Sequence, residues 1–193
     1  ALALVVTATL ALGAWQFWSA RRSAADALQD PVVAVLPLTN LSGENQNDYL
    51  SAGVTDVIIA KLASLPGARL LATSATAPYR EGADRVQRAI RDLGATLIVE
   101  GSLQRAGNRL QVTARLLKAG SPEILWSRTF SAPVDDTFGL QRQITDGLIP
   151  ALQAAGALTR TLTPQDRARL GDAPTSNTEA FADYGQARLF LER

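Results

Sequence analysis

Residues 95–117 constrain the fold more than any other stretch, because they carry the pattern of a β-hairpin. One arm places Leu97, Val99 and Leu103 on one face and Glu100, Ser102 and Gln104 on the other, and the next arm alternates Leu110, Val112, Ala114 and Leu116 with Gln111, Thr113 and Arg115. Alternation with a period of two is typical of a strand with one buried face. Between the arms, Ala106, Gly107 and Asn108 predict the turn, since Gly and Asn tolerate a positive φ. The hairpin therefore predicts a folded sheet domain, although its side chains include no reactive set.

The segments that flank the hairpin complete an α/β pattern. They predict strands over 32–38, 69–73 and 124–130, helices over about 48–64 and 83–93, and a long helix that begins at Asp135–Asp136. The run 32–38 is apolar throughout, as in a central strand buried on both faces, and Pro37 indicates that its pairing stops there. The order β-α-β-α-β-β-β-α favours a single mixed β-sheet with helices packed on it. The first three strands are expected to be partly parallel and the last three antiparallel.

Four local features refine this prediction. Pro150 is expected to kink or split the long helix. Thr163 and Pro164 predict the start of a short helix, as amino-terminal cap and first helical residue. Alternation within 124–130 places Trp126 and Ile124 on one face. The last predicted helix, from Thr178 to Arg193, shows no partner that would cover its apolar face.

Composition excludes several kinds of chemistry. The chain has no Cys and no His, which removes disulfides, thiol nucleophiles, imidazole bases and the usual zinc sites. Its net charge is +1, so bulk electrostatics give no reason to expect nucleic acid as a partner of this segment. No Ser-His-Asp, Cys-His or clustered carboxylate set is present.

The first 18 residues predict a membrane helix. They carry no charge, end in an aromatic group at Trp15, Phe17 and Trp18, and span roughly 27 Å as a helix, close to the thickness of a hydrocarbon core. Two alternatives remain open, a signal-peptide core and a buried helix. Residues 19–30 are expected to be a juxtamembrane linker. The pair Arg21–Arg22 alone favours a cytoplasmic carboxyl-terminal side. Charges upstream of residue 1 also bear on the orientation and can outweigh two arginines, so the orientation stays open at this point.

Five candidate sites each have a structural interpretation that we favour. Asp135 and Asp136 are expected to cap a helix rather than bind metal, and Glu100 to be structural or exposed. The loop Asn40–Gly43 joins a strand to a helix amino terminus, where ligands can bind, but a simple connector is favoured. Tyr79–Arg80 is expected to pack rather than touch a partner, and Arg105, Arg109 and Arg115 to form a solvated edge. We therefore assign no catalytic, cofactor-binding or metal-ligating residue and no cofactor.

A series of short motifs resembles the TolB amino-terminal-like domain over about residues 32–160. The matching segments are Ala34–Leu38, Asn40–Gly43, Tyr49–Thr55, Leu65–Gly67, Tyr79–Arg80, Leu93–Ala95, Val99–Ser102, Leu125–Ser127 and Phe138–Gln141. Leu38 departs from the Phe that is common there, and Pro150 interrupts the usual helix. Within Val99–Ser102, Gly101 is expected to mark a close backbone approach or a bulge.

Asn177–Arg188 is similar to the first helix of a tetratricopeptide repeat. Phe181, Tyr184, Gly185 and Ala187 match the positions for an aromatic, a large apolar residue, a small residue and Ala, whereas Arg188 departs from the expected aromatic. The resemblances imply the organisation 1–18 membrane helix, 19–30 linker, 31–160 TolB amino-terminal-like domain, 161–176 linker helix and 177–193 start of the repeat region.

The resemblance implies one segment of a membrane-anchored bacterial signalling protein. The catalytic or regulatory module in such proteins is a serine/threonine kinase, a class III adenylate cyclase or a winged-helix domain, and this chain is most similar to the kinase-linked type. We expect a noncatalytic sensor or interaction domain in the inner membrane, with residues 31–193 periplasmic. Its partners would be the membrane through residues 1–18, a protein or an unknown small ligand, and a second copy in a homo-oligomer. The alternatives are a periplasmic assembly or scaffold protein, the cyclase-linked or winged-helix-linked form, and a soluble enzyme.

Overall fold

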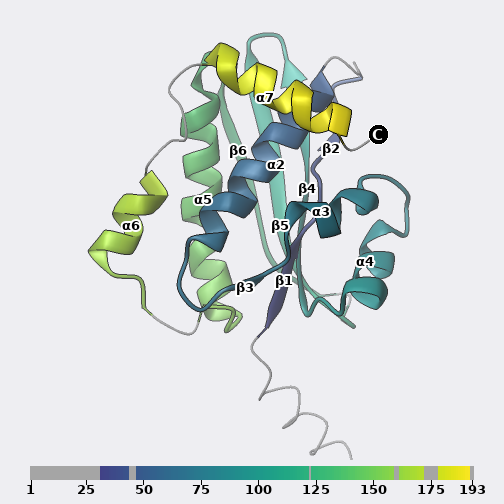
Figure 1. Cartoon of the computed structure of the whole chain (residues 1–193), viewed down its shortest axis with the longest axis vertical. Helices are drawn as coiled ribbons and strands as arrows, with labels where there is room; N and C mark the ends of the chain where they lie inside the picture. Colours follow the sequence, from purple (N-terminus) through teal and green to yellow (C-terminus); the bar gives the residue numbers. More distant parts are fainter. Residues whose placement is uncertain (1–30, 44–46, 122, 159–160, 172–177, 192–193) are drawn as a thin grey trace, which may run out of the picture. The chain divides into compact units, whose positions relative to one another are not determined.

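The structure is a computed structural model that describes residues 31–43, 47–121, 123–158, 161–171 and 178–191 of the 193-residue chain. The chain divides into two units, 1–30 and 31–193, and every described residue belongs to the second (Figure 1). The predicted membrane helix at 1–18 and the linker at 19–30 lie outside the described residues. Within the described ranges, no helix has both the length and the apolar character needed to span a membrane.

A single mixed sheet forms the centre of the domain. Its strands are β1 (Val32–Val35), β2 (Thr39–Asn40), β3 (Arg69–Leu70), β4 (Leu97–Ala106), β5 (Arg109–Lys118) and β6 (Ile124–Pro133). The order is β3-β1-β4-β5-β6, and β2 pairs with β4 beyond the end of β1. β1 is parallel to both β3 and β4, whereas β4, β5 and β6 are antiparallel neighbours. The predicted mixed sheet, with its parallel and antiparallel parts, is confirmed.

The central strand is buried on both faces, as its apolar run predicts. Val33 and Val35 belong to the core on one side of the sheet, and Ala34 and Leu36 to the core on the other. The last backbone hydrogen bond of this run joins the Leu36 amide to the Val99 carbonyl, so the prediction that its pairing stops at Pro37 is confirmed. Beyond Pro37, the separate short strand β2 pairs with β4 from Thr39 onward. A proline removes one donor, and the backbone beyond it remains able to pair.

The hairpin has the predicted faces and a shorter turn. The residues predicted to face the core lie in one core cluster, namely Leu97, Val99, Leu103, Leu110, Val112, Ala114 and Leu116. Ala106 pairs with Arg109, so the turn contains only Gly107 and Asn108. Gly107 has φ of 58°, and no non-glycine residue among those described has a positive φ. A positive φ at the first turn position alone is the geometry of a type II′ turn, which requires Gly there.

β6 runs from Ile124 to Pro133, three residues further than predicted. Its register shifts near its start, where Leu117 pairs with Ile124 but Leu116 pairs with Trp126. Leu125 is the extra residue, so alternation fails at this point. Trp126 packs against the core, while Ile124 is 53% exposed, and the prediction that the two share a face is wrong.

Helices cover the two faces of the sheet unequally. α2 (Asp48–Ala63) and α5 (Thr137–Ala154) contact each other and pack on one face, where Figure 1 shows them in front of the strands. The short η2 (Ala77–Tyr79) and α4 (Arg85–Leu93) cover the opposite face around β1 and β4. α3 (Thr73–Thr76) and η2 occupy the stretch predicted to be irregular, and β3 is correspondingly shorter than the predicted strand.

The helices after β6 correct two predictions. A short turn, η3 (Val134–Asp136), precedes α5. Of the predicted kink or split at Pro150, the split is wrong, because α5 continues through Pro150 as one helix, and the kink stays a prediction. Pro150 is exposed, which leaves its ring free of the core. α6 (Pro164–Gly171) begins at the predicted proline, and Thr163 and Asp166 cap it reciprocally. α7 (Thr178–Leu191) packs on α2, so the last helix does have a partner.

Candidate functional site

The chain leaves the carboxyl ends of the neighbouring parallel strands β1 and β3 on opposite faces of the sheet. The connection from β1 runs through α2 to β3, and the connection from β3 runs through α4 to β4 on the other side of β1. The two helices lie on opposite faces of the sheet. In open α/β sheets, such a reversal leaves a crevice beyond the strand ends, where ligands bind. This end of β1 is therefore the first place to search for a site.

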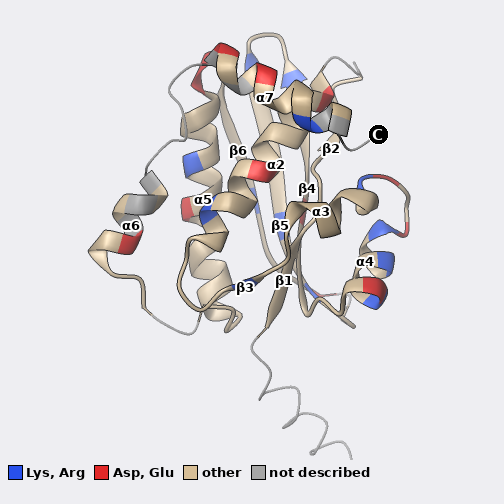
Figure 2. Ribbon diagram, in the orientation of Figure 1, with Lys and Arg blue, Asp and Glu red and all other residues tan. Residues whose placement is uncertain are grey.

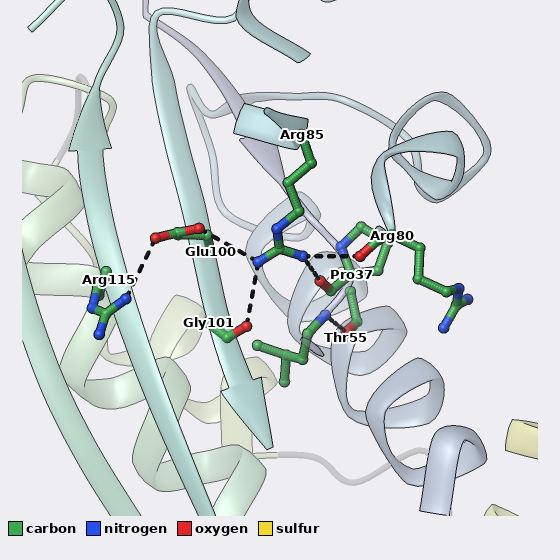
Figure 3. A network of polar contacts seen from close by, with 8 residues as sticks. Pro37, Thr55, Arg80, Arg85, Glu100, Gly101 and Arg115 are labelled. Atoms are coloured by element: carbon green, nitrogen blue, oxygen red, sulfur yellow. Dashed lines mark hydrogen bonds and ion pairs between the residues drawn. The ribbon is translucent and has the colours of Figure 1, made fainter. Parts of the chain in front are cut away.

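Arg85 organises the backbone at this position from the first turn of α4 (Figure 3). Its Nη1 donates to the carbonyl oxygens of Pro37 at 2.7 Å and Arg80 at 3.3 Å. Its Nη2 donates to Glu100 Oε2 at 3.4 Å and to the Gly101 carbonyl at 3.5 Å. Arg85 is only 9% exposed. One guanidinium thus joins three segments, namely the chain just beyond the carboxyl end of β1, the loop before α4 and the middle of β4.

Glu100 extends this network across the sheet. Its Oε1 lies 3.6 Å from Arg115 Nη1 on β5, and its Oε2 pairs with Arg85. The carboxylate therefore bridges two guanidinium groups from α4 and β5, as Figure 3 shows. This placement agrees with the predicted structural role of Glu100. Arg115, predicted to belong to a solvated edge, is exposed but forms this ion pair.

Thr55 fixes the backbone on the other side of Pro37. Its Oγ1 accepts from the amide of Leu38 at 3.1 Å and donates to the carbonyl of Ser51, one turn earlier in α2, at 2.7 Å. The hydroxyl is buried and uses both its donor and an acceptor. Consequently, the chain that leaves β1 is anchored to α2 by Thr55 and to α4 by Arg85.

The loop Asn40–Gly43 is tied to the first turn of α2 and to β4. Asn40 Nδ2 donates to Asp48 Oδ1 at 2.7 Å, and Asn40 Oδ1 accepts from the amide of Ser42 at 2.9 Å. Ser42 Oγ in turn accepts from the amide of Arg105 at 2.8 Å. The sequence favours a simple connector for this loop. In the structure, the loop is a connector held by side-chain hydrogen bonds, and it also lines a cleft.

The cleft has a volume of about 320 Å³ and opens between this loop, α2 and the loop before α4. Its lining residues are Leu38, Thr39, Asn40, Gly43, Asp48, Ser51, Arg80 and Glu81. Ser51 is 1% exposed, and its Oγ has no hydrogen-bond partner in the described structure. Nine in ten or more buried polar groups are satisfied in native proteins, so this hydroxyl is an exception that needs an explanation.

A larger hollow of about 470 Å³ lies between α5 and α6 and is lined by Arg142, Asp146, Ile149, Pro150, Gln153, Leu162 and Leu170. Its charged and amide side chains, Arg142, Asp146 and Gln153, are exposed to solvent. Among the lining side chains that the structure describes, none has a buried polar atom without a partner, in contrast to the cleft. We therefore favour the smaller cleft as the candidate site.

The helix that lines the cleft also holds α7. Tyr184 OH donates to Asp56 Oδ2, and Arg188 Nε lies 3.4 Å from the same oxygen. Asp56 also accepts from Thr73 Oγ1 at 2.6 Å. Gly185 lies so close to α2 that an added Cβ would be 2.5 Å from the carbonyl oxygen of Tyr49. Tyr49 is next to Asp48 in the sequence, so the α7 contact and the cleft meet in the first turn of α2.

Replacing Gly185 with valine is expected to displace α7, because real Cβ atoms essentially never approach a backbone oxygen as closely as 2.5 Å. The measurement is hydrogen exchange of the α7 amides, which should become markedly faster while β4 and β5 keep their protection. The control is Gln186→Val, which places the same β-branched residue at an exposed position of the helix. Equal protection of α7 in the two variants would contradict the close contact.

Tyr79 packs as predicted, at the end of η2 beneath α4. It is 7% exposed, and its hydroxyl donates to Asp92 Oδ2 at 3.0 Å. Burial raises the pKa of the Tyr79 phenol above its ordinary value of 10.0, the Asp92 carboxylate raises it further, and the nearby Arg88 guanidinium lowers it. Arg80 contributes its backbone carbonyl to Arg85, while its guanidinium extends away from the network in Figure 3.

The raised pKa of Tyr79 predicts a loss of stability in alkali. Above about pH 10 the unfolded chain releases the phenolic proton while the folded chain keeps it, so the free energy of unfolding falls as pH rises through the folded pKa. Below about pH 10 this contribution is fully present. Urea unfolding between neutral and alkaline pH should show a steeper decline for the wild type than for Tyr79→Phe. Parallel declines would contradict the assigned environment.

The remaining sequence candidates have structural positions. Asp136 Oδ1 accepts from the amide of Gly139 at 3.0 Å, so it caps α5 as predicted. Arg109 donates to Ser131 Oγ at 3.0 Å, and Arg105 donates to the carbonyl of Gly107 at 3.2 Å. Both arginines are exposed, as the predicted solvated edge requires. Sequence reasoning missed Ser51 and Asp56, because one serine and one aspartate in a helix form no recognisable motif.

Comparison with known proteins gives no matching family model. The chain is similar to "Putative adenylate cyclase 3" from Rhizobium meliloti, with 29% identity over 123 residues. The match covers 64% of this chain and 21% of that protein, so the chain spans about a fifth of the length of this curated relative.

Three solved structures are similar at low identity. The LpoB C-terminal domain from Salmonella enterica has a TM-score of 0.44 and 16% identity, and the match covers 54% of this chain and 83% of that one. TolB from Acinetobacter baumannii has a TM-score of 0.45 and 17% identity, and the match covers 65% of this chain and 29% of that one. Lipoprotein GNA1162 from Neisseria meningitidis has a TM-score of 0.46 and 14% identity, and the match covers 64% of this chain and 99% of that one. The kinase-linked type and the tetratricopeptide start remain predictions.

Proposed function

We propose that this chain is a noncatalytic sensor or interaction domain of a membrane-anchored bacterial signalling protein. The observation that carries the proposal is the position of α2. Its first turn lines the cleft through Asp48 and Ser51, and the same helix holds α7 through Tyr49 and Asp56. A ligand in the cleft would therefore contact the same helix that holds α7. A domain that binds a ligand and passes the change on to another segment needs such a shared helix.

The sequence supports a binding role rather than a reaction. A chain without Cys and His lacks the usual nucleophile and base pairs of hydrolases and transferases. Arg85 beside the cleft is engaged in holding backbone, and the lining residues Arg80 and Glu81 are of opposite sign. Figure 2 shows both colours in the loop before α4. We propose accordingly that catalysis belongs to another module of the full-length protein.

The setting of the domain is part of the proposal. The similarity to the Rhizobium meliloti protein supports a nucleotide cyclase as the catalytic module more directly than the serine/threonine kinase that the sequence resemblance implies. Residues 1–18 would anchor the protein in the inner membrane, and residues 31–193 would lie outside the cytoplasm. The uncharged, aromatic-ended character of residues 1–18 supports this anchor.

The test uses the full-length protein in membranes and compares the wild type with Gly185→Val and with the control Gln186→Val. Cyclic AMP formation and ATP-dependent autophosphorylation are both measured. Gly185→Val should change one of them by about fivefold or more, the range of ordinary coupling between sites, at equal protein level. Unchanged output, or ATP hydrolysis by the purified 193-residue chain itself, would contradict the proposal.

A further inference from the structure

We propose that the cleft at the carboxyl end of β1 binds a free α-amino acid. This inference rests on the proposed sensing function and names the class of ligand. Its starting point is Ser51, whose buried hydroxyl lines the cleft without a hydrogen-bond partner in the described structure. A buried hydroxyl without a partner is costly, and a polar ligand in the cleft would supply the missing bond.

The amino terminus of α2 adds a second polar feature to the same wall. The residue that precedes the helix, Asn47, makes no side-chain cap, and its Oδ1 accepts instead from Arg105 Nη1 at 3.4 Å. The first amides of a helix and the positive end of its dipole favour a negative group. Ser51 is the fourth residue of this helix. Its hydroxyl and the amides at the start of the helix can therefore donate hydrogen bonds to the same group of a ligand. A carboxylate fits that position.

The charged side chains of the cleft select a ligand with both signs. The lining of the cleft includes one basic residue, Arg80, and two acidic residues, Asp48 and Glu81. A plain anion such as phosphate would meet two negative groups, and a plain cation would meet Arg80. A zwitterion matches both signs, because its carboxylate can pair with Arg80 and accept from the Ser51 hydroxyl while its ammonium pairs with the acidic residues. Amino acids are the common small zwitterions, and about 320 Å³ accommodates one.

The walls of the cleft are held in place before any ligand arrives. Arg85 fixes the Pro37 and Arg80 carbonyls, Asn40 bonds Asp48, and Arg88 Nη2 donates to the Glu81 carbonyl at 2.7 Å. A preformed site avoids much of the ordering cost of binding. This arrangement separates the cleft from an incidental gap between loops, whose walls would lack such cross-links.

The test is isothermal titration of the 193-residue chain with each of the twenty common L-amino acids and, separately, with glycerol and glucose. At least one amino acid should bind with a Kd at or below about 1 mM. Its amide and its N-acetyl derivative, which each lack one charge, should not bind. Ser51→Ala and the exposed Glu81→Gln should each weaken binding by about tenfold, a typical loss for one bond to a charged group. Ser74→Ala, an exposed serine of α3, should leave binding unchanged.

Absence of binding by every amino acid, binding of the sugars alone, or binding that survives both cleft variants would overturn the inference. The ligand assignment and the proposed signalling function can be tested separately. If no amino acid binds while Gly185→Val still changes the output of the full-length protein, only the ligand assignment falls. If an amino acid binds at the cleft while that output is unchanged, the ligand assignment stands and the signalling role falls.

Discussion

Replacing Gly101 with alanine is expected to lower the free energy of unfolding by about 3 kcal/mol, at the upper end for overpacking in a core. A Cβ at this position would overlap the backbone carbonyl oxygen of Thr113 on β5 and lie 2.9 Å from Leu38 Cδ2. The Thr113 oxygen belongs to the backbone, so relief of this overlap requires β4 and β5 to separate. The Leu38 methyl ends a buried side chain, which must also shift. Urea denaturation followed by circular dichroism measures the loss.

The matched control for Gly101 is the neighbouring Ser102→Ala. Ser102 is half-buried on the polar face of β4, and its replacement removes one oxygen without adding volume. Its effect should stay within about 0.5 kcal/mol, as for most surface changes. If Gly101→Ala were equally mild, the close approach between β4 and β5 at Gly101 would be wrong. The sequence prediction of a close backbone approach at this glycine would then fail with it.

Replacing Arg85 with alanine is expected to cost about 3 kcal/mol, the usual loss when one partner of a buried ion pair is removed. Its side chain is 11% exposed, and the Glu100 side chain is 18% exposed. Without the guanidinium, the Pro37 carbonyl and one carboxylate oxygen lose their donors in a poorly solvated place. Arg85→Lys should recover only part of the loss, since one ammonium cannot reproduce the planar fork.

Arg91→Ala on the same helix is the control for Arg85. Arg91 is an exposed residue in the last turn of α4. Substitutions at surface positions usually change the free energy of unfolding by no more than about 0.5 kcal/mol. Chemical denaturation should therefore separate the two variants clearly. Similar losses for both would mean that the network around Arg85 contributes no more than a surface side chain.

Periodicity explains why much of the fold is predictable from sequence. The hairpin, the doubly buried β1 and the stripes of α2 and α5 follow from spacing that only one burial pattern satisfies. The misses lie where a single residue acts locally. Pro150 does not split α5, because the helix continues beyond one lost donor. Leu125 breaks the alternation of β6 through a bulge that composition does not mark.

The site was less predictable than the fold, because it depends on contacts between distant segments. Ser51 lines the cleft with residues from two loops, and Asp56 joins α2 to α7, which follows it by more than one hundred residues. The loop Asn40–Gly43 did carry a signal, since it joins a strand to a helix amino terminus. The contact of α7 with α2 had none, because Gly185 has meaning only beside the Tyr49 carbonyl.

In the proposed function, the first turn of α2 connects the cleft to α7. Hydrogen exchange of the α7 amides in Asp48→Ala, compared with the wild type, measures this connection. Asp48 lines the cleft and bonds Asn40, and its neighbour Tyr49 carries the carbonyl that Gly185 contacts. Exchange in α7 should become about fivefold faster or more, with no change in the control Asp135→Ala, an exposed position of η3 that does not line the cleft. Faster exchange confined to the Asn40–Gly43 loop and the start of α2, with α7 unchanged, would show that this turn does not connect the cleft to α7.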